Sequence, residues 1–250
     1  MHRKELAQIL EQTLMAQPIK DFCPNGLQVE GRAHINKVVT GVTASQALVD
    51  KAVALEADAL IVHHGYFWKG ESQAITGMKK RRIEALLSAG INLFAYHLPL
   101  DIHPQLGNNA QLAQLLDIEI QGPMESGPSS VPVWGRLRTP LSGQAFADKI
   151  AKVLSRTPLA SVVRDEVIET VGLCTGGGQG YIDLAASLGL DAYLTGEASE
   201  QTIHSSREQG VDFFAAGHHA TERYGAKALG EFLAREHHLD VTFIDIDNPV

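Results

Sequence analysis

Short apolar runs alternate with stretches of helical periodicity along most of the chain. The runs are rich in Val, Ile and Leu and have the length of buried strands. They predict strands at residues 38–42, 59–62, 91–95, 171–174, 192–194, 211–216 and 241–246. The stretches between them predict helices at residues 45–56, 79–89, 108–116, 182–188 and 221–236. This alternation is typical of an α/β protein.

The two halves of the chain repeat one pattern. "VVTGVTASQALVDKAVALEADALIVHHG" begins at Val38 and "TVGLCTGGGQGYIDLAASLGLDAYLTGE" at Thr170, and each predicts a strand, a helix, Asp-Ala and a second strand. "GINLFAYHLPLD" and "GVDFFAAGHHATE" then match, with one extra residue in the second. We interpret this as a duplicated α/β unit and predict that residues 38–101 superpose on residues 170–222. The Gly-, Pro- and Ser-rich segment 122–132 is the predicted linker between a first repeat, residues 1–121, and a second, residues 133–250.

Histidines and carboxylates follow three of the predicted strands. The candidate site residues are His63, His64, His97, Asp101, His218, His219 and Glu222. Because ligands collect beyond the carboxyl ends of strands in open α/β sheets, these side chains can converge if the repeats pack face to face. A single histidine at a strand end is usually structural. Two His-His pairs and two H-x-x-x-acid spacings at matching places in a repeat favour a metal site instead.

The donor atoms indicate which metals would bind. Imidazole nitrogen and carboxylate oxygen suit Zn, Mn, Fe, Co or Ni. Adjacent histidines that leave a strand can serve one ion each, and a carboxylate such as Glu222 can bridge two ions. Two ions about 3.5–4 Å apart would activate a shared water and polarise a bound oxygen. Whether His97 and His219 are ligands or hydrogen-bonding neighbours stays open.

Other motifs allow two interpretations each. The Gly-rich "CTGGGQGYID" lacks the Lys-Ser/Thr of a P-loop, so it is either a tight turn or a phosphate site at a helix N-terminus. Glu197 stands where the first repeat has His63-His64, and is a general base, a residue behind a ligand or a surface carboxylate. Residues 66–68 are aromatic and either stack on a base or pack against a neighbouring subunit. The turn in "CPNGLQVEG" is a candidate border of the site.

Composition narrows the class of protein. The chain has 250 residues and a net charge of −8, which disfavours nucleic-acid binding, and the basic run at residues 79–82 is more typical of a solvated helix face. Cys23 and Cys174 are the two cysteines, and we expect reduced thiols in a cytoplasmic protein. The N-terminal residues predict an amphipathic helix and no signal peptide, and no segment is long and apolar enough to span a bilayer.

The motifs together resemble the NIF-three-like family over essentially the whole chain. They are "PNGLQVEG", "VTGVTASQALVD", "VHHGYFWKGE", "HLPLD", "GNNAQLA", "CTGGGQ", "TGE" and "AAGHHATER". Members of the family are often named GTP cyclohydrolase 1 type 2 homologues, and the chain looks most similar to the YbgI-type members. The resemblance implies two intertwined α/β repeats with mixed sheets, a dinuclear metal site between the repeats and a homohexameric ring.

The family's ligand pattern matches five residues of this chain. By resemblance, His64 and Asp101 hold one ion, His63 and His218 hold the other, and Glu222 bridges them. The pattern leaves His97 and His219 as neighbours. Two divalent metal ions per chain are therefore the expected cofactor.

Two functions remain open. The first is a cytoplasmic metal-dependent hydrolase that acts on a nucleotide or a related phosphorylated compound. In it, Glu197 and His97 would transfer protons. By resemblance, its reaction would open the imidazole ring of GTP and release formate. The second is a non-enzymatic metal-binding ring with a regulatory or scaffold role. Metal-dependent turnover would distinguish the first from the second.

Overall fold

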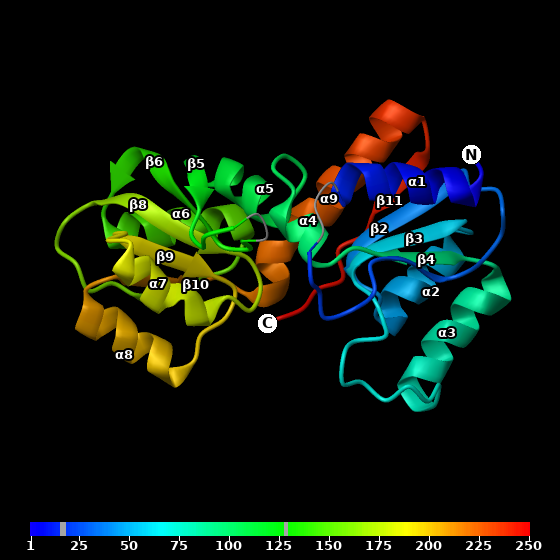
Figure 1. Ribbon diagram of the computed structural model, residues 1–250, viewed down its shortest axis with the longest axis horizontal. Helices are drawn as coiled ribbons and strands as arrows, with labels where there is room; N and C mark the ends of the chain where they lie inside the picture. The colour runs from blue at the N-terminus through cyan, green and yellow to red at the C-terminus, as the bar shows by residue number, and fades with distance from the viewer. Residues whose placement is uncertain (16–18, 128–129) are drawn as a thin grey trace. The chain divides into compact units, whose positions relative to one another are not determined.

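The computed structural model describes residues 1–15, 19–127 and 130–250, and it divides the chain into two compact units (Figure 1). Unit 1 contains Met1–Leu100 and Gly225–Asp247, and unit 2 contains Asp101–Tyr224 and Asn248–Val250. Each unit has its own mixed β-sheet. The predicted α/β class with mixed sheets is therefore confirmed.

The sheet of unit 1 has five strands in the order β1-β4-β3-β2-β11. They are β1 (Gly26–Val29), β2 (Lys37–Thr43), β3 (Ala59–His64), β4 (Asn92–Ala95) and β11 (Asp240–Phe243). Neighbouring strands are parallel except for β1, which is antiparallel to β4. Alternate residues of β3, Leu60 and Val62, pack in one core cluster with the apolar faces of α2 and α3, as the period of two in a strand requires.

Two helices of unit 1 have capping residues that are typical of helix ends. The helices of this unit are α1 (Arg3–Leu14), α2 (Gln46–Ala54), α3 (Gly77–Ala89), most of the short α4 (Leu98–Ile102) and the later part of α9 (His218–His237). Ser45 caps α2 through its hydroxyl, and Gly90 ends α3 with a φ of 66° that favours glycine. The buried residues Leu6, Leu10 and Leu14 lie on one face of α1, as the periodicity predicts.

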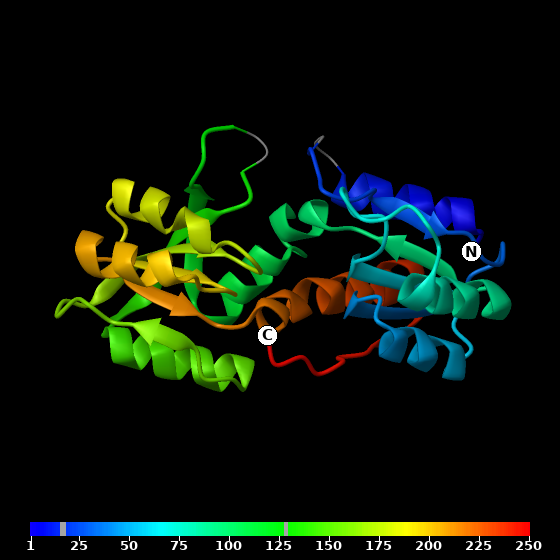
Figure 2. The same ribbon diagram turned by 90° about the horizontal axis from the view of Figure 1, so that it is seen from below.

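The sheet of unit 2 has six strands in the order β5-β6-β8-β9-β10-β7. They are β5 (Ile118–Pro123), β6 (Val133–Leu141), β7 (Leu159–Ser161), β8 (Ile168–Cys174), β9 (Ala192–Thr195) and β10 (Asp212–Ala215). The helical segments are α5 (Asn108–Leu115), α6 (Gly143–Leu154), η1 (Gln179–Tyr181), α7 (Ile182–Ser187), α8 (Glu200–Gln209) and the start of α9. Figure 2 shows α6 on one side of this sheet and α7 and α8 on the other.

Four strands of each sheet follow one plan. The order β1-β4-β3-β2 in unit 1 corresponds to β7-β10-β9-β8 in unit 2. Strands β4, β3 and β2 are parallel to one another, and so are β10, β9 and β8. The outer strands β1 and β7 are each antiparallel to their neighbour. The segments predicted to be duplicated therefore have the same strand order and directions.

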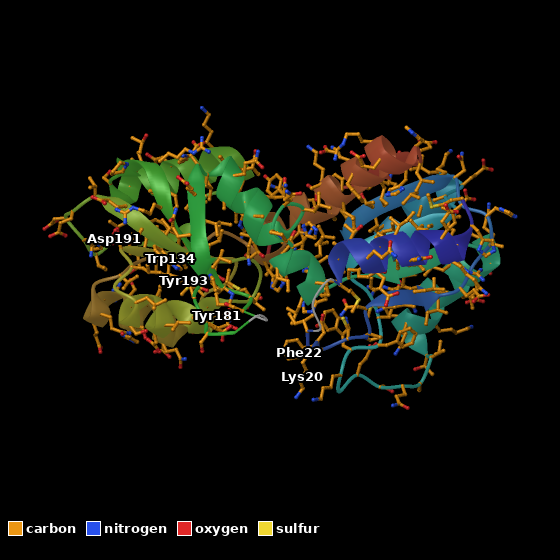
Figure 3. All side chains as sticks on the ribbon, turned by 45° about the horizontal axis from the view of Figure 1, so that its top comes forward. Lys20, Phe22, Trp134, Tyr181, Asp191 and Tyr193 are labelled. Carbon is orange, nitrogen blue, oxygen red and sulfur yellow. The ribbon has the colours of Figure 1, made fainter. Side chains whose placement is uncertain are left out.

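The shared Asp-Ala of the repeat has the same role in both units. Asp58 accepts hydrogen bonds from the backbone N–H groups at the start of β2 and pairs with Arg32 at 2.9 Å. Asp191, labelled in Figure 3, accepts hydrogen bonds from the backbone N–H groups at the start of β8 and pairs with Arg164 at 2.9 Å. Burial raises the pKa of each carboxyl, but these hydrogen bonds outweigh it and lower the pKa below its usual range. Each aspartate thus fixes the start of the neighbouring strand.

The compact units do not divide the chain where the predicted repeats do. The predicted linker, residues 122–132, connects β5 to β6 within the sheet of unit 2, and residues 128–129 lie outside the described part of the chain. Residues 101–121 belong to unit 2, and most of α9 with β11 belongs to unit 1. The repeat boundaries at residues 121 and 133 stay a prediction, since a compact unit and a sequence repeat need not coincide.

Several helices and strands of the structure were not predicted by the sequence analysis. Among them is α8, a polar helix whose buried side chains are Thr202 and Ser206. The Ser206 hydroxyl contacts the Ser161 hydroxyl at 2.9 Å and donates to the carbonyl of Val211, so hydrogen bonds help to fix this helix. Cys23 and Cys174 are buried and form no disulfide. No helix in the described ranges has the length and apolar character that crossing a membrane requires.

Candidate metal centre

Three imidazoles of unit 1 form a cluster at one edge of its sheet. His63 and His64 end β3, and His97 follows β4, the parallel neighbour of β3. One ring nitrogen from each residue lies within 4.8 Å of the others. The ring centroid of His63 lies 4.4 Å from that of His64 and 5.1 Å from that of His97. The carboxyl ends of two parallel strands therefore bring together three donors, as the sequence predicts for this half of the chain.

The hydrogen bond of His63 prepares its ring for a cation. His63 is completely buried, and its Nδ1 lies 3.1 Å from the carbonyl oxygen of Tyr96. Because a carbonyl only accepts, Nδ1 carries the proton and the lone pair of the neutral ring is at Nε2. Metal-binding histidines commonly have this arrangement. The Nδ1 of His64 lies 3.0 Å from the Thr43 hydroxyl, which can donate or accept.

Two residues near His97 were not among the candidate site residues of the sequence analysis. Asp21 and Cys23 form a second group with His97, again within 4.8 Å, and the Asp21 carboxylate contacts His97 Nδ1 at 2.7 Å. Burial raises the pKa of the Cys23 thiol to about 12, and the charge of Asp21 adds to this effect, so the metal-free protein keeps a neutral thiol here. The one available signal was the neighbouring turn at Asn25, which the sequence placed at the border of the site.

Unit 2 surrounds one imidazole with two carboxylates. His218 and Glu222 lie one turn apart at the start of α9, and His218 Nε2 is 3.3 Å from the Glu222 carboxylate. Glu197, just after β9, contacts His218 Nδ1 at 2.6 Å. Burial lowers the pKa of His218, but Glu222 and Glu197 outweigh it and raise the pKa to about 9. This surrounding favours positive charge, whether a proton or a metal ion supplies it.

The Gly-rich turn packs directly against these side chains. Gly176 has a φ of +68°, and a Cβ there would overlap Oε1 of Glu222 and lie 3.1 Å from His218 Nε2. Its N–H donates to the Thr221 hydroxyl at 3.0 Å. The glycine is thus explained by the close approach of the backbone to Glu222. The following helix α7 has six residues, so the phosphate interpretation receives no support from a long helix.

Asp101 lies in a polar part of unit 2. It is 4% exposed, accepts a hydrogen bond from the Asn108 amide at 2.8 Å, and contacts the Thr175 hydroxyl at 3.4 Å. Burial raises the pKa of the Cys174 thiol, and the charges of Asp101 and Glu222 add to it. The charges of Asp101 and Glu222 therefore both act on the buried Cys174 thiol in unit 2.

His219 is placed differently from the other candidates. Its backbone N–H donates to the carbonyl of Val250 at 2.9 Å. It belongs to none of the metal-candidate groups found in residues 1–15, 19–127 and 130–250. Its role, as a ligand or as a hydrogen-bonding neighbour, stays a prediction.

The aromatic residues 66–68 have different surroundings. Tyr66 is buried and donates its hydroxyl to the carbonyl of Ala44, and Phe67 lies under the Lys79 ammonium at 4.7 Å. The Trp68 ring instead lies 4.9 Å from His97. Only Trp68 of this run therefore borders the imidazole cluster. Lys79 itself is buried, so the predicted solvated face does not include it.

The fold and these clusters define an α/β protein with two mixed sheets and buried histidine–carboxylate groups suited to a metal ion. The chain belongs to the Duf34/NIF3 (NGG1p interacting factor 3) family, whose sequence profile matches residues 1–249. The predicted resemblance is therefore confirmed.

Named relatives cover the whole chain. It is 62% identical over 250 residues to "GTP cyclohydrolase 1 type 2 homolog" of Haemophilus influenzae, with all of both chains covered. It is 56% identical to the solved structure of protein ybgI, described as of unknown function, with a TM-score of 0.97 and all of both chains covered. For TTHA1606 from Thermus thermophilus the identity is 35% and the TM-score 0.89, again over both full chains.

Proposed function

We propose that the chain is a metal-dependent hydrolase whose two divalent ions are held by His63, His64, Asp101, His218 and Glu222. His64 and Asp101 hold one ion, His63 and His218 hold the other, and Glu222 bridges them. The observation that carries the proposal is the hydrogen bond from His63 Nδ1 to the Tyr96 carbonyl, because it leaves the lone pair of a fully buried ring at Nε2. The carboxylates around His218 support it, since they favour a cation at the same ring.

The proposed substrate class is a nucleotide or a related phosphorylated compound, with GTP as the first candidate because of the names of the relatives. Two bound divalent ions would acidify water and polarise a substrate oxygen. In the reaction on GTP, one water opens the C8–N9 bond and leaves a formamide. A second water hydrolyses the formamide and releases C8 as formate.

His97 and Glu197 are the proposed proton-transfer residues. His97 lies beside His63 and His64, and its Nδ1 contacts Asp21. Glu197 contacts Nδ1 of His218, so it also orients that ring. His97 therefore has the clearer position for accepting a proton, and Glu197 the clearer position for supporting a ligand.

Metal content and turnover test the proposal together. The protein is stripped with a chelator, reloaded separately with Mn, Fe, Co, Ni and Zn, and analysed for metal per chain and for formate release from GTP. We expect two ions per chain and metal-dependent formate release. His63→Ala should lower both, whereas His204→Ala, which removes an imidazole that is 60% exposed on α8, should change neither.

Two outcomes would contradict parts of the proposal. Tight metal binding without turnover of GTP or a broad nucleotide and phosphoester panel would favour a non-enzymatic metal-binding scaffold. Full metal binding by His63→Ala would remove that residue from the ligand set. The homohexameric ring is a separate proposal, and light scattering should then give six times the chain mass of 27.0 kDa.

A further inference from the structure

A single buried carboxylate in unit 1 receives several hydrogen bonds beside the imidazole cluster. The Asp21 side chain is 4% exposed. One of its oxygens contacts the backbone N–H of Phe22 at 2.6 Å and His97 Nδ1 at 2.7 Å. The other contacts the amide nitrogen of Asn25 at 2.9 Å and the backbone N–H of Leu98 at 3.0 Å. Asp21 therefore ties a loop near the N-terminus to the start of α4.

Three of these four partners can only donate. The backbone N–H groups of Phe22 and Leu98 have no alternative role. The orientation of the Asn25 amide is also determined, because its oxygen accepts the backbone N–H of His97 at 2.8 Å and its nitrogen must then face Asp21. The Asp21 oxygens thus act as acceptors on both sides.

The charge of Asp21 shows that the fourth partner, His97, also donates. The ordinary pKa of an aspartate, about 3.9, already lies far below neutral pH, and three groups that can only donate favour the charged form of Asp21 further. An ionised carboxylate offers acceptors only. His97 Nδ1, 2.7 Å away, must therefore carry a proton.

We propose that Asp21 is a positioning residue that fixes the His97 ring as the Nδ1–H tautomer, so that the lone pair of the neutral ring is at Nε2. His63 Nδ1 likewise contacts an acceptor, the Tyr96 carbonyl, and His218 Nδ1 contacts the Glu197 carboxylate. The use of this lone pair as a proton acceptor rests on the proposed function. The tautomer itself rests only on the contacts within unit 1.

The rings around His97 help to hold its orientation. Trp68 meets the His97 ring nearly edge to face at a centroid distance of 4.9 Å, and Phe22 does so at 6.3 Å. Phe22, labelled in Figure 3, is 59% exposed, whereas the His97 side chain is 14% exposed. Asp21 thus selects the tautomer, and the two aromatic rings restrict the tilt of the imidazole.

A purely structural role for Asp21 makes a different prediction. Through the N–H of Leu98, Asp21 also satisfies the first turn of α4, and this alone would explain a buried aspartate. If Asp21 were only such a cap, its removal would lower the stability of the protein and would leave the tautomer of His97 unchanged. The state of the His97 ring therefore distinguishes the two roles.

Ring-nitrogen NMR of the metal-free, ¹⁵N-histidine-labelled protein tests the proposal. The His97 signals are identified by their absence from His97→Gln, and spectra are recorded at a pH where their own shifts show a neutral ring. We expect a protonated Nδ1 and an unprotonated Nε2 in the wild type. A wild-type ring protonated at Nε2 would overturn the proposal without reference to any variant.

The variant Asp21→Ala tests whether Asp21 causes this tautomer. Alanine removes both acceptor oxygens, whereas asparagine would keep one that could still face His97, so we expect the Nδ1–H tautomer to lose its preference in Asp21→Ala. Asp58→Ala is the matched control, since Asp58 is another carboxylate of unit 1 and accepts hydrogen bonds from Arg32 and from the backbone N–H groups of residues 36 and 37. An unchanged His97 tautomer in folded Asp21→Ala would show that Asp21 does not select it.

Turnover separates this inference from the proposed function. If metal-loaded wild type releases formate from GTP, Asp21→Ala should lower kcat about 10–100-fold with KM nearly unchanged. A kcat equal to the wild-type value would refute the link between the tautomer and proton transfer. If the wild type releases none, the proposed function fails for GTP, and the ring-nitrogen spectra still decide whether Asp21 sets the tautomer.

Discussion

Replacing Gly176 with alanine should destabilise the protein and weaken metal binding, because the Gly-rich turn at this position lies against Glu222. Gly176 is buried, has a φ of +68°, and leaves no room for a side chain. A Cβ would overlap Oε1 of Glu222, lie 3.0 Å from Cδ of the same residue and 3.1 Å from His218 Nε2. The substitution must therefore move the Glu222 carboxylate or the loop.

Gly189 provides a control with the same backbone conformation. It also has a φ of +68°, but it is exposed and has no atom within 4 Å of an added Cβ. Gly189→Ala should therefore cost only the left-handed conformation, about 1–2 kcal/mol of unfolding free energy. Gly176→Ala should cost that amount plus about 1–3 kcal/mol for overpacking. The difference between the two variants isolates the contact with Glu222 and His218.

Urea unfolding of the metal-free variants and Co²⁺ titration provide the two measurements. We expect Gly176→Ala to be the less stable variant and to bind Co²⁺ at least about tenfold more weakly than Gly189→Ala, which corresponds to about 1.4 kcal/mol. Equal stability and equal Co²⁺ affinity in the two variants would refute the reasoning. The backbone at Gly176 would then have no part in placing the Glu222 carboxylate.

Three further predictions concern charged groups. Glu222→Gln should lower the metal content per chain measured by elemental analysis, and retention of both ions at full affinity would exclude Glu222 as the bridge. Glu197→Gln should lower the pKa of His218 in the metal-free protein, because it removes one of the carboxylates that raise it to about 9; an NMR titration with no shift would exclude Glu197 as a cause. The folded pKa of Asp58 is lowered, so its contribution to stability is present above the unfolded pKa of about 3.9 and is lost as pH falls through the folded pKa. The stability difference between wild type and Asp58→Asn should therefore be full at pH 7 and shrink in acid, and a constant difference would contradict this.

The local pattern of the sequence determined the elements whose periodicity reflects burial. Strand β3 reads as an apolar run that ends in two histidines, and the structure buries that run and puts both rings at the sheet edge. The repeated Asp-Ala likewise predicted equivalent units, and Asp58 and Asp191 make equivalent contacts. The polar helix α8 escaped prediction because its buried residues are Thr202 and Ser206, which leave no apolar stripe.

Only the tertiary structure decided how each ring nitrogen is used. Asp21 and His97 are 76 positions apart in the chain, and no spacing rule relates them. They meet because strand pairing brings the loop before β1 to the end of β4, its antiparallel partner. Residue type and strand period determine which side chains reach a sheet edge. The hydrogen-bond partner that places the proton on one ring nitrogen comes from a distant segment, so it depends on the completed fold.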